Sequence, residues 1–242
     1  STRQGGVSPA PWDNLNLGSN RGDDPENVRW NFNWFCSVIG TDEEALVKNH
    51  QVHGDLIRPV TREDILPDPA QPGTVEADGL ITDQPEVCLT IFSGDCIPIL
   101  LYDPVRRCIA AAHAGWRGTA LGIAARAVEA MVRDYGCRAE HILAAIGPGI
   151  GPCCFETHSD VPDGLRAHLD GDAEPFIRPL SKPGKFSVDL KGANSRWLER
   201  AGLLPAHIAL CPVCTACNLD EFWSHRVQGN ARGSMAAMIQ LV

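Results

Sequence analysis

The sequence lacks an apolar run long enough to cross a bilayer. Its longest apolar region, residues 87–102, is interrupted by Ser93, Gly94 and Asp95 and again by Pro98, whereas a membrane-spanning helix needs about 20 mostly apolar residues. The first residues also lack the charged and then apolar order of a signal peptide. We therefore expect a cytoplasmic protein with no membrane partner.

Basic residues are in deficit. The chain has 21 Lys and Arg against 30 Asp and Glu, which gives a formal net charge of −9. A protein that wraps nucleic acid needs a basic face to meet the phosphates, so we expect no nucleic-acid partner. A small anion can still bind such an acidic protein where arginines gather locally.

Internal repeats, low-complexity tracts and long blocks of one charge are also absent. The 242 residues are 44% hydrophobic and 21% charged, which is the composition of an ordinary globular protein. This length is near the upper limit for one hydrophobic core. We therefore expect a single catalytic domain over residues 1–242.

Short apolar runs and amphipathic segments alternate along the chain in no regular order. The pattern predicts helices at residues 26–39, 119–135, 161–169 and 190–201, and strands at residues 46–52, 87–92, 97–102, 108–112, 142–146, 207–210 and 235–241. Residues 59–74 read as an exposed excursion, and residues 147–152 as a stiff turn. Because no βαβ repeat emerges, we predict an α+β fold with a mixed sheet flanked by helices.

The ten cysteines are unevenly distributed. Five are scattered, mostly in apolar runs, and are expected to be small buried hydrophobes: Cys36, Cys88, Cys96, Cys108 and Cys137. The others are clustered, and in a reducing compartment clustered cysteines indicate metal or redox chemistry before a disulfide framework: Cys153, Cys154, Cys211, Cys214 and Cys217. Cys211, Cys214 and Cys217 could form a redox pair or, with His225, a second zinc site, but packing thiols are the favoured interpretation.

Three segments place reactive groups at the ends of predicted strands. His53 precedes a glycine, Cys96 lies between two strands, and His113 lies where a strand turns toward a helix. Two imidazoles and one thiolate suit zinc, and three protein ligands leave a fourth position for water or substrate. The residues alone also allow two histidines with backbone partners and one buried thiol.

Eight motifs, in the same order, span nearly the whole chain and resemble the YfiH-type laccase-domain family of purine nucleoside phosphorylases. They are Asn16-Leu-Gly with Asn20-Arg21, Gln51-Val-His-Gly, Ala77-Asp-Gly-Leu-Ile-Thr-Asp, Asp95-Cys-Ile-Pro, His113-Ala-Gly-Trp-Arg-Gly-Thr, Gly147-Pro-Gly-Ile-Gly-Pro-Cys-Cys-Phe-Glu, Asp189-Leu and Cys214-Thr. The elements that begin at Asp95 and His113 are the most specific. The chain departs from the pattern at Ser93-Gly94, and at residues 222–227, where His225 replaces an aromatic residue and one arginine is missing.

The resemblance implies an α+β fold and zinc bound by His53, Cys96 and His113. It also implies phosphorolysis of adenosine, inosine, guanosine and methylthioadenosine, with adenosine deamination as a side activity. Purine nucleosides and phosphate would then be the partners, and the protein a monomer or a homodimer. The usual H-x-E and P-C-x-x-C elements of zinc deaminases are missing, so deamination would need another site architecture.

Phosphorolysis requires a phosphate clamp, for which the planar fork of arginine is well suited. Arg21, Arg117 and Arg226 each lie in or beside a matched motif, so we expect them to bind phosphate. The catalytic candidates are Asp95, Cys96 and Arg117. Asp95 would be a general base or orient a ligand, although neighbours on an extended strand face opposite sides.

Several residues have a weaker or no functional indication. Asp78 is interpreted as a turn former or as a functional carboxylate. The histidines outside the motifs are expected to be solvated or satisfied in the core: His50, His141, His158, His168 and His207.

Other activities remain open. Cys96 activated by His113 would form a nucleophilic dyad for amide hydrolysis, as in editing of peptidoglycan precursors. The family's laccase name suggests a copper polyphenol oxidase, but the eight histidines include no H-x-H pair of the kind that multicopper oxidases use. A regulatory binder without catalysis is the fourth interpretation.

Overall fold

The computed structural model describes residues 1–242. Its α-helices are α1 (Pro25–Ile39), α2 (Trp116–Leu121), α3 (Ile123–Tyr135), α4 (Asp160–Leu169), α5 (Leu190–Arg200) and α6 (His225–Gln228). Its strands are β1 (Leu46–Lys48), β2 (Ile57–Pro59), β3 (Gly79–Thr82), β4 (Cys88–Ser93), β5 (Ile97–Asp103), β6 (Cys108–Ala114), β7 (Leu143–Ile146), β8 (Glu156–Thr157), β9 (Ile177–Pro179), β10 (Phe186–Val188), β11 (Ile208–Leu210) and β12 (Met235–Ile239). Short 3-10 helices occupy several of the connections.

A six-stranded mixed sheet forms the centre of the molecule. Its strand order is β11-β7-β5-β6-β3-β2, in which the two outermost pairs are parallel and the inner pairs are antiparallel. Every residue of β6 is buried. Successive side chains of a strand point to opposite faces, so β6 contributes to a core on each side of the sheet.

A three-stranded sheet, ordered β1-β4-β12, packs on one face of the large sheet. The core between them contains Val47, Leu89 and Ile91 from the small sheet and Leu80, Ile109 and Ala111 from the large one. The other alanines of β6, Ala110, Ala112 and Ala114, belong to the core cluster on the opposite face of the large sheet.

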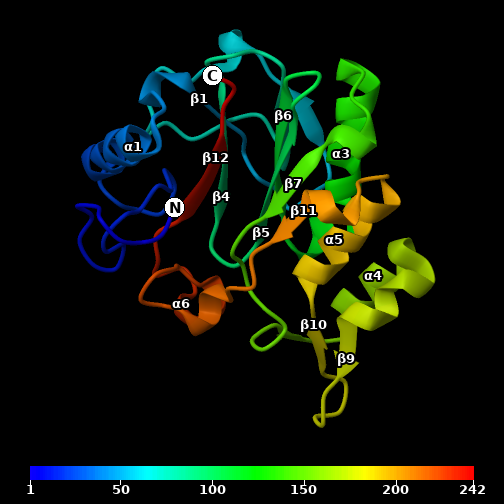
Figure 1. Cartoon of the computed structure of the whole chain (residues 1–242). Helices are drawn as coiled ribbons and strands as arrows, with labels where there is room; N and C mark the ends of the chain where they lie inside the picture. The colour runs from blue at the N-terminus through cyan, green and yellow to red at the C-terminus, as the bar shows by residue number, and fades with distance from the viewer.

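Helices cover the two outer faces. Helix α1 packs Val28 and Phe32 against the small sheet, while α3, α4 and α5 pack on the far side of the large sheet over the largest core cluster. Figure 1 shows the resulting order of layers, from α1 through β4 and β12 to β5, β6 and β7 and then to α3 and α5. The expected α+β fold with a mixed sheet flanked by helices is confirmed.

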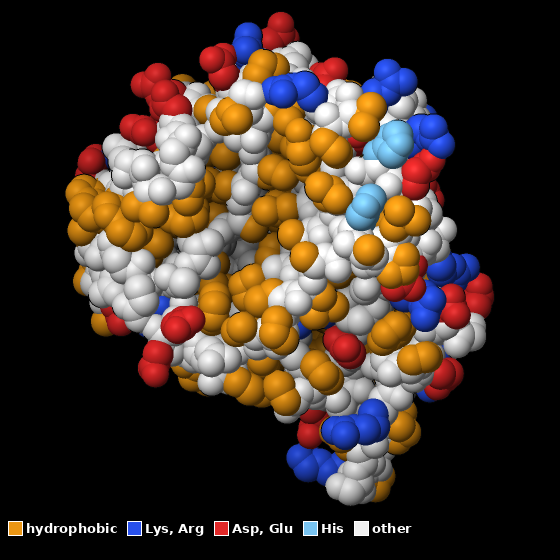
Figure 2. Space-filling view, in the orientation of Figure 1, with side chains coloured by type: hydrophobic (Ala, Val, Ile, Leu, Met, Phe, Trp, Pro, Cys, Tyr) orange, Lys and Arg blue, Asp and Glu red, His pale blue; other side chains and the backbone are white.

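Strands β8, β10 and β9 form a second, separate three-stranded sheet. Strands β9 and β10 run into an arm that projects below the body in Figure 1, and Lys and Arg side chains gather near its tip in Figure 2. Elsewhere on the face drawn in Figure 2, hydrophobic side chains gather over the middle and charged ones over the periphery. None of the helices is both long and apolar enough to cross a membrane.

Two sequence expectations differ from the structure. The helix expected over residues 119–135 is two helices, because Gly122 has a φ of 82° and ends α2 with a left-handed cap. The strand expected over residues 46–52 stops at Lys48. The chain then forms the loop that carries His53.

Candidate metal centre and pocket

His53, Cys96 and His113 meet at one point. One possible ligand atom from each residue lies within 4.8 Å of those of the other two, and the two imidazole rings are 4.9 Å apart with an interplanar angle of 77°. Cys96 directly precedes β5, and His113 lies opposite Pro98 in the antiparallel pairing of β5 and β6. The central sheet thereby brings two of the three predicted ligands together.

Asp78 supports both histidines. Its carboxylate accepts hydrogen bonds from the backbone N–H groups of Val52 (3.1 Å), His53 (2.9 Å) and Gly54 (2.7 Å). It also lies 2.8 Å from Nδ1 of His113. His53 has a φ of 64°, a strained conformation for a residue with a Cβ. Asp78 therefore holds the loop of one predicted ligand and orients the ring of the other.

The electrostatics of the site favour a charged thiolate. Burial opposes ionisation of Cys96, but the His113 and His53 rings stabilise the thiolate and lower its pKa to about 6. Burial likewise opposes a charge on His113, but Cys96 and Asp78 raise its pKa to about 9. For Asp78, hydrogen bonds from His113 and Gly54 outweigh burial and lower the pKa. The Cys96 thiolate, the His113 imidazolium and the Asp78 carboxylate therefore carry alternating negative, positive and negative charges.

The donor set fits a metal ion. Imidazole nitrogen and thiolate sulfur are both ligands that zinc takes, and a carboxylate that holds the ring of a ligating histidine is the usual support of a metal site. A His₂Cys set also occurs in copper sites with a weak axial methionine, glutamine or backbone oxygen, and Gln51 lines this pocket. The residues present therefore fit a transition-metal ion.

The three residues line a pocket of about 650 Å³, within the range of small-molecule sites. The pocket walls come from both ends and the middle of the chain. Phe92, Trp116 and Phe155 supply aromatic surface, and His50 and His158 also line the pocket. These two histidines were expected to be solvated or in the core.

All three arginines predicted to bind phosphate also line this pocket. Arg21 is partly buried and donates to the Ser234 hydroxyl at 3.0 Å, while Arg117 lies over the Trp116 ring. Arg226 donates to the carbonyl oxygens of Cys154 and Glu156, each at 2.9 Å. None of the three forms an ion pair with a carboxylate, because every ion pair of the structure involves other residues.

A fourth arginine, Arg232, was not predicted from the sequence. Its side chain lines the pocket and is only 6% exposed, and its Nε has no hydrogen-bond partner. Burial, followed by the neighbouring charge of Arg21, lowers its pKa to about 10. Arg232 lies in a short loop of mostly Gly, Asn and Ser residues before β12. The sequence feature that could have identified it as a site residue is an arginine in such a loop of an acidic chain.

Asp95 lines the pocket, and both of its carboxylate oxygens accept hydrogen bonds. Its carboxylate accepts hydrogen bonds from the Thr215 hydroxyl (2.6 Å), the Ser224 hydroxyl (3.0 Å) and the backbone N–H of Arg226 (2.6 Å). Its φ of 104° shows that it does not continue an extended strand, so the expected alternation of faces does not apply. Asp95, which directly precedes Cys96, thereby connects the backbone at Cys96 to the segments that contain Thr215 and Arg226.

This fold and site define a class: an α+β protein with a candidate His₂Cys metal centre in an arginine-lined pocket. The sequence matches the family described as multi-copper polyphenol oxidoreductase laccase over residues 1–242. The chain therefore belongs to that family.

The relatives within the family are named for a different activity. The chain is 37% identical to "Purine nucleoside phosphorylase YlmD" of Geobacillus stearothermophilus, covering 99% of this chain and 88% of the relative. It is 38% identical to "Purine nucleoside phosphorylase" of Deinococcus radiodurans, covering 100% and 87%. The crystal structure of the Bacillus licheniformis hypothetical protein YfiH has a TM-score of 0.95 at 34% identity, covering 100% and 91%. These names support an enzyme.

Proposed function

We propose that this chain is a zinc-dependent purine nucleoside phosphorylase acting on adenosine, inosine, guanosine and methylthioadenosine. The observation that carries the proposal is a pocket in which the potential ligand atoms of His53, Cys96 and His113 converge beside arginines without carboxylate partners. The names of the relatives agree with it. The cytoplasm is the proposed location.

Arg232 and Arg21 are the proposed main phosphate ligands. A buried guanidinium with an unpartnered Nε is costly, and a phosphate oxygen would satisfy it. Arg117 and Arg226 are more exposed and would contact the outer oxygens or the nucleoside. Phosphate held in this way would attack C1′ of the ribose as the C1′–N9 bond breaks. The purine then leaves as the free base with the proton of the phosphate, and ribose 1-phosphate forms. The negative charge of the phosphate would stabilise the positive character that develops on the sugar.

His53, Cys96 and His113 would hold the zinc, with Asp78 fixing the ring of His113. Bound zinc supplies a Lewis acid with an open position for a substrate oxygen or water. The aromatic surface of Phe92, Trp116 and Phe155 provides flat apolar contacts for a purine ring. Asp95, with both carboxylate oxygens engaged, acts as a positioning residue for Cys96 and Arg226.

Adenosine deamination is proposed as a side activity of the same pocket. It requires water in place of phosphate and a reaction at C6 of the purine instead of C1′. The residues that hold the metal would be shared, whereas the arginines would not be required. Loss of Arg232 should therefore reduce phosphorolysis more than deamination.

One observation favours a second candidate. Asp78, His113 and Cys96 also form the acid–histidine–thiolate order of a cysteine hydrolase, which would cleave amides such as those of peptidoglycan precursors. His53 distinguishes the two, because a triad does not need a second imidazole beside the thiolate. A hydrolase of this kind would retain its activity in a chelator and be inactivated by alkylation of Cys96.

The test is to incubate the purified protein with inosine or adenosine, with and without phosphate, and to separate the products. We expect base and ribose 1-phosphate in equal amounts, only when phosphate is present. Arg232→Met should raise the KM for phosphate by at least about tenfold, the loss of one charge-assisted contact. The exposed Arg178→Met is the matched control. Absence of any product from either nucleoside would refute the proposal.

A further inference from the structure

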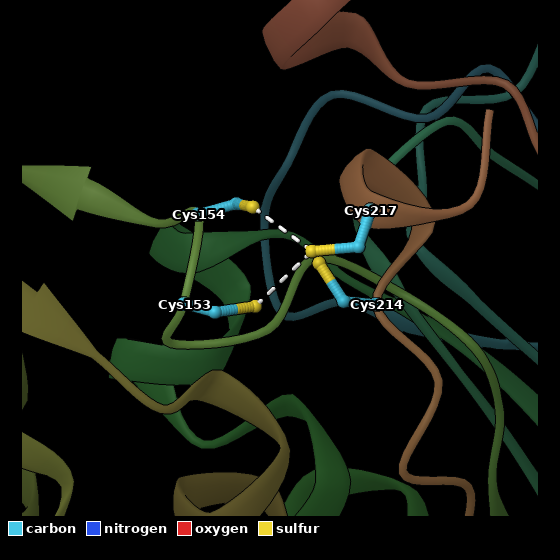
Figure 3. A group of neighbouring side chains, drawn as sticks. All are labelled: Cys153, Cys154, Cys214 and Cys217. Atoms are coloured by element: carbon cyan, nitrogen blue, oxygen red, sulfur yellow. Dashed lines mark hydrogen bonds between the residues drawn. The ribbon is translucent and has the colours of Figure 1, made fainter.

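Four cysteines outside the pocket gather at one point. The Sγ atoms of Cys153, Cys154, Cys214 and Cys217 all lie within 4.8 Å of one another. Cys217 Sγ lies 3.3 Å from Cys154 Sγ and 3.5 Å from Cys153 Sγ. All four are free thiols. Figure 3 shows the Cys153 and Cys154 side chains pointing from one loop toward those of Cys214 and Cys217 on another.

We propose that these four cysteines bind a second, structural zinc ion, distinct from the metal of the pocket. In a tetrahedral Zn(Cys)₄ site with Zn–S bonds of about 2.3 Å, neighbouring sulfurs are about 3.8 Å apart. The observed cluster needs shifts of about 1 Å or less to reach that geometry. A site with four protein ligands is closed, which is typical of structural zinc.

The sheet explains why residues so distant in sequence converge. Strands β7 and β11 pair in parallel, so the loops after them leave the sheet at the same edge. A further bridge pairs Gly149 with Cys214, and the backbone N–H of Thr215 donates to Gly149. The backbone therefore holds the two loops together at the cluster.

The surroundings suit a metal thiolate. The backbone N–H of Gly151 donates to Cys214 Sγ at 3.2 Å, and a Cβ at Gly151 would lie 3.3 Å from Cys153 Sγ, so glycine permits this approach. Buried Lys191 donates to the carbonyl oxygens of Cys211 and Val213. Its positive charge and that of Arg226, on the Cys154 carbonyl, offset the net negative charge of a tetrathiolate site.

Packing thiols were the interpretation favoured from the sequence, whereas Cys153 and Cys217 are exposed. The alternative set of Cys211, Cys214, Cys217 and His225 does not gather at one point, because neither Cys211 nor His225 is in the cluster. The structure replaces them with the adjacent pair Cys153 and Cys154.

The proposed zinc would stiffen one wall of the pocket. One bridged loop continues into Phe155 and Glu156, which line the pocket. The other carries Thr215, whose hydroxyl donates to Asp95 beside Cys96. A cross-link between these loops would fix Asp95 and Arg226 relative to the metal centre without contacting substrate.

The test is zinc content per folded chain, measured by elemental analysis. We expect about two equivalents in the wild type and about one in Cys153→Ser/Cys217→Ser, whose substituted side chains are exposed. The control Cys211→Ser, on the same loop but outside the cluster, should retain both, and His113→Ala should lose only the pocket metal. Equal zinc in the wild type and the double variant would overturn the proposal.

A second measurement does not depend on the folding of Cys153→Ser/Cys217→Ser. Cobalt-loaded Cys96→Ala, which lacks the pocket site, should show intense sulfur-to-cobalt charge-transfer absorption, and Cys96→Ala/Cys217→Ser should not. Absence of this absorption in Cys96→Ala would overturn the proposal. So would mass spectrometry that finds a disulfide among the four cysteines of freshly purified wild-type protein.

Discussion

Asp78 connects the two histidines of the metal centre at the scale of single residues. Its side chain is almost fully buried, and it accepts three successive backbone N–H groups and faces the His113 ring. The left-handed backbone of His53 costs about 1–2 kcal/mol, which these hydrogen bonds offset. Metal affinity should therefore depend on a carboxylate that does not touch the metal.

Asp78→Asn should weaken zinc binding by about 10–100-fold, the usual effect of losing such a support. An amide can replace only one of the two acceptor oxygens, and its NH₂ group would face backbone N–H donors. Zinc affinity is measured by competition with a chromophoric chelator. Asp55→Asn, which removes a half-buried carboxylate two residues from His53, is the control. Equal affinities for both variants would contradict this role of Asp78.

Zinc affinity should rise with pH. Zinc binds thiolate and neutral imidazole; with pKa values of about 6 for Cys96 and about 9 for His113, the metal-free site holds thiolate and imidazolium between these values. Binding there releases the His113 proton, so affinity should rise about tenfold per pH unit and level off above about pH 9. Below about pH 6 the thiolate also gains a proton, and affinity should fall more steeply. Competition titrations from pH 5 to 10 check this, and a flat profile would exclude it.

The predicted residues in the pocket were found through motifs, whereas Asp78 and Arg232 were undervalued or missed. Asp78 precedes a glycine, and an Asp-Gly pair is as typical of a turn as of a site. Arg232 follows the last motif shared with the family. It lies in a loop whose proximity to Arg21 cannot be predicted from short-range sequence patterns. Their roles depend on contacts between distant segments, which a single sequence does not reveal.

At the scale of elements, the junction of β6 and α2 positions the metal centre. β6 supplies His113, and Gly115, the N-cap of α2, then lies beside the other two predicted ligands. An ideal Cβ at Gly115 would lie 2.7 Å from His53 Cδ2 and 3.3 Å from Cys96 Sγ. Glycine is therefore needed here for space, since its φ of −67° is open to any residue.

Gly115→Ala should displace the His53 ring and reduce zinc affinity by at least about tenfold, as for loss of ligand support, while the fold is retained. The control is Gly171→Ala, where an added Cβ meets nothing within 4 Å. Bound zinc and the circular dichroism spectrum are compared for both. Full zinc affinity in Gly115→Ala would show that the ring is not in this position.

The elements that the sequence predicts best are long or strongly apolar. Helix α1 was expected within a few residues of its bounds because its apolar residues recur at helical spacing, and strands β4, β5 and β6 because each is a continuous apolar run. Strands β2, β8, β9 and β10 have only two or three residues each, too few to show a period. Their pairing with distant strands decides their conformation.

At the scale of the whole molecule, the pocket joins segments from both ends of the chain. Arg21 donates to Ser234, 213 residues away, and the middle of the chain supplies the metal ligands. The acidic chain, with a net charge of −9, keeps four arginines at this one place. Ordering of the pocket and folding of the chain should therefore be linked.

Removal of metal should lower the Tm. A ligand at about 100 times its Kd stabilises the folded state by about 2.7 kcal/mol, which for a chain of this size corresponds to about 5–10 °C. Differential scanning calorimetry with and without a chelator measures the shift. Cys96→Ala lacks the pocket metal already, so its shift should be smaller than that of the wild type. An equal shift in both proteins would place the stabilising metal outside the pocket.

The central claim, that His53, Cys96 and His113 share one zinc ion, is tested most directly by anomalous diffraction across the zinc absorption edge. Crystals of protein purified without added copper are predicted to give a peak about 2.0–2.3 Å from the two imidazole nitrogens and the Cys96 sulfur. The peak should disappear below the zinc edge. No peak between these side chains, or one that persists down to the copper edge, would contradict the account.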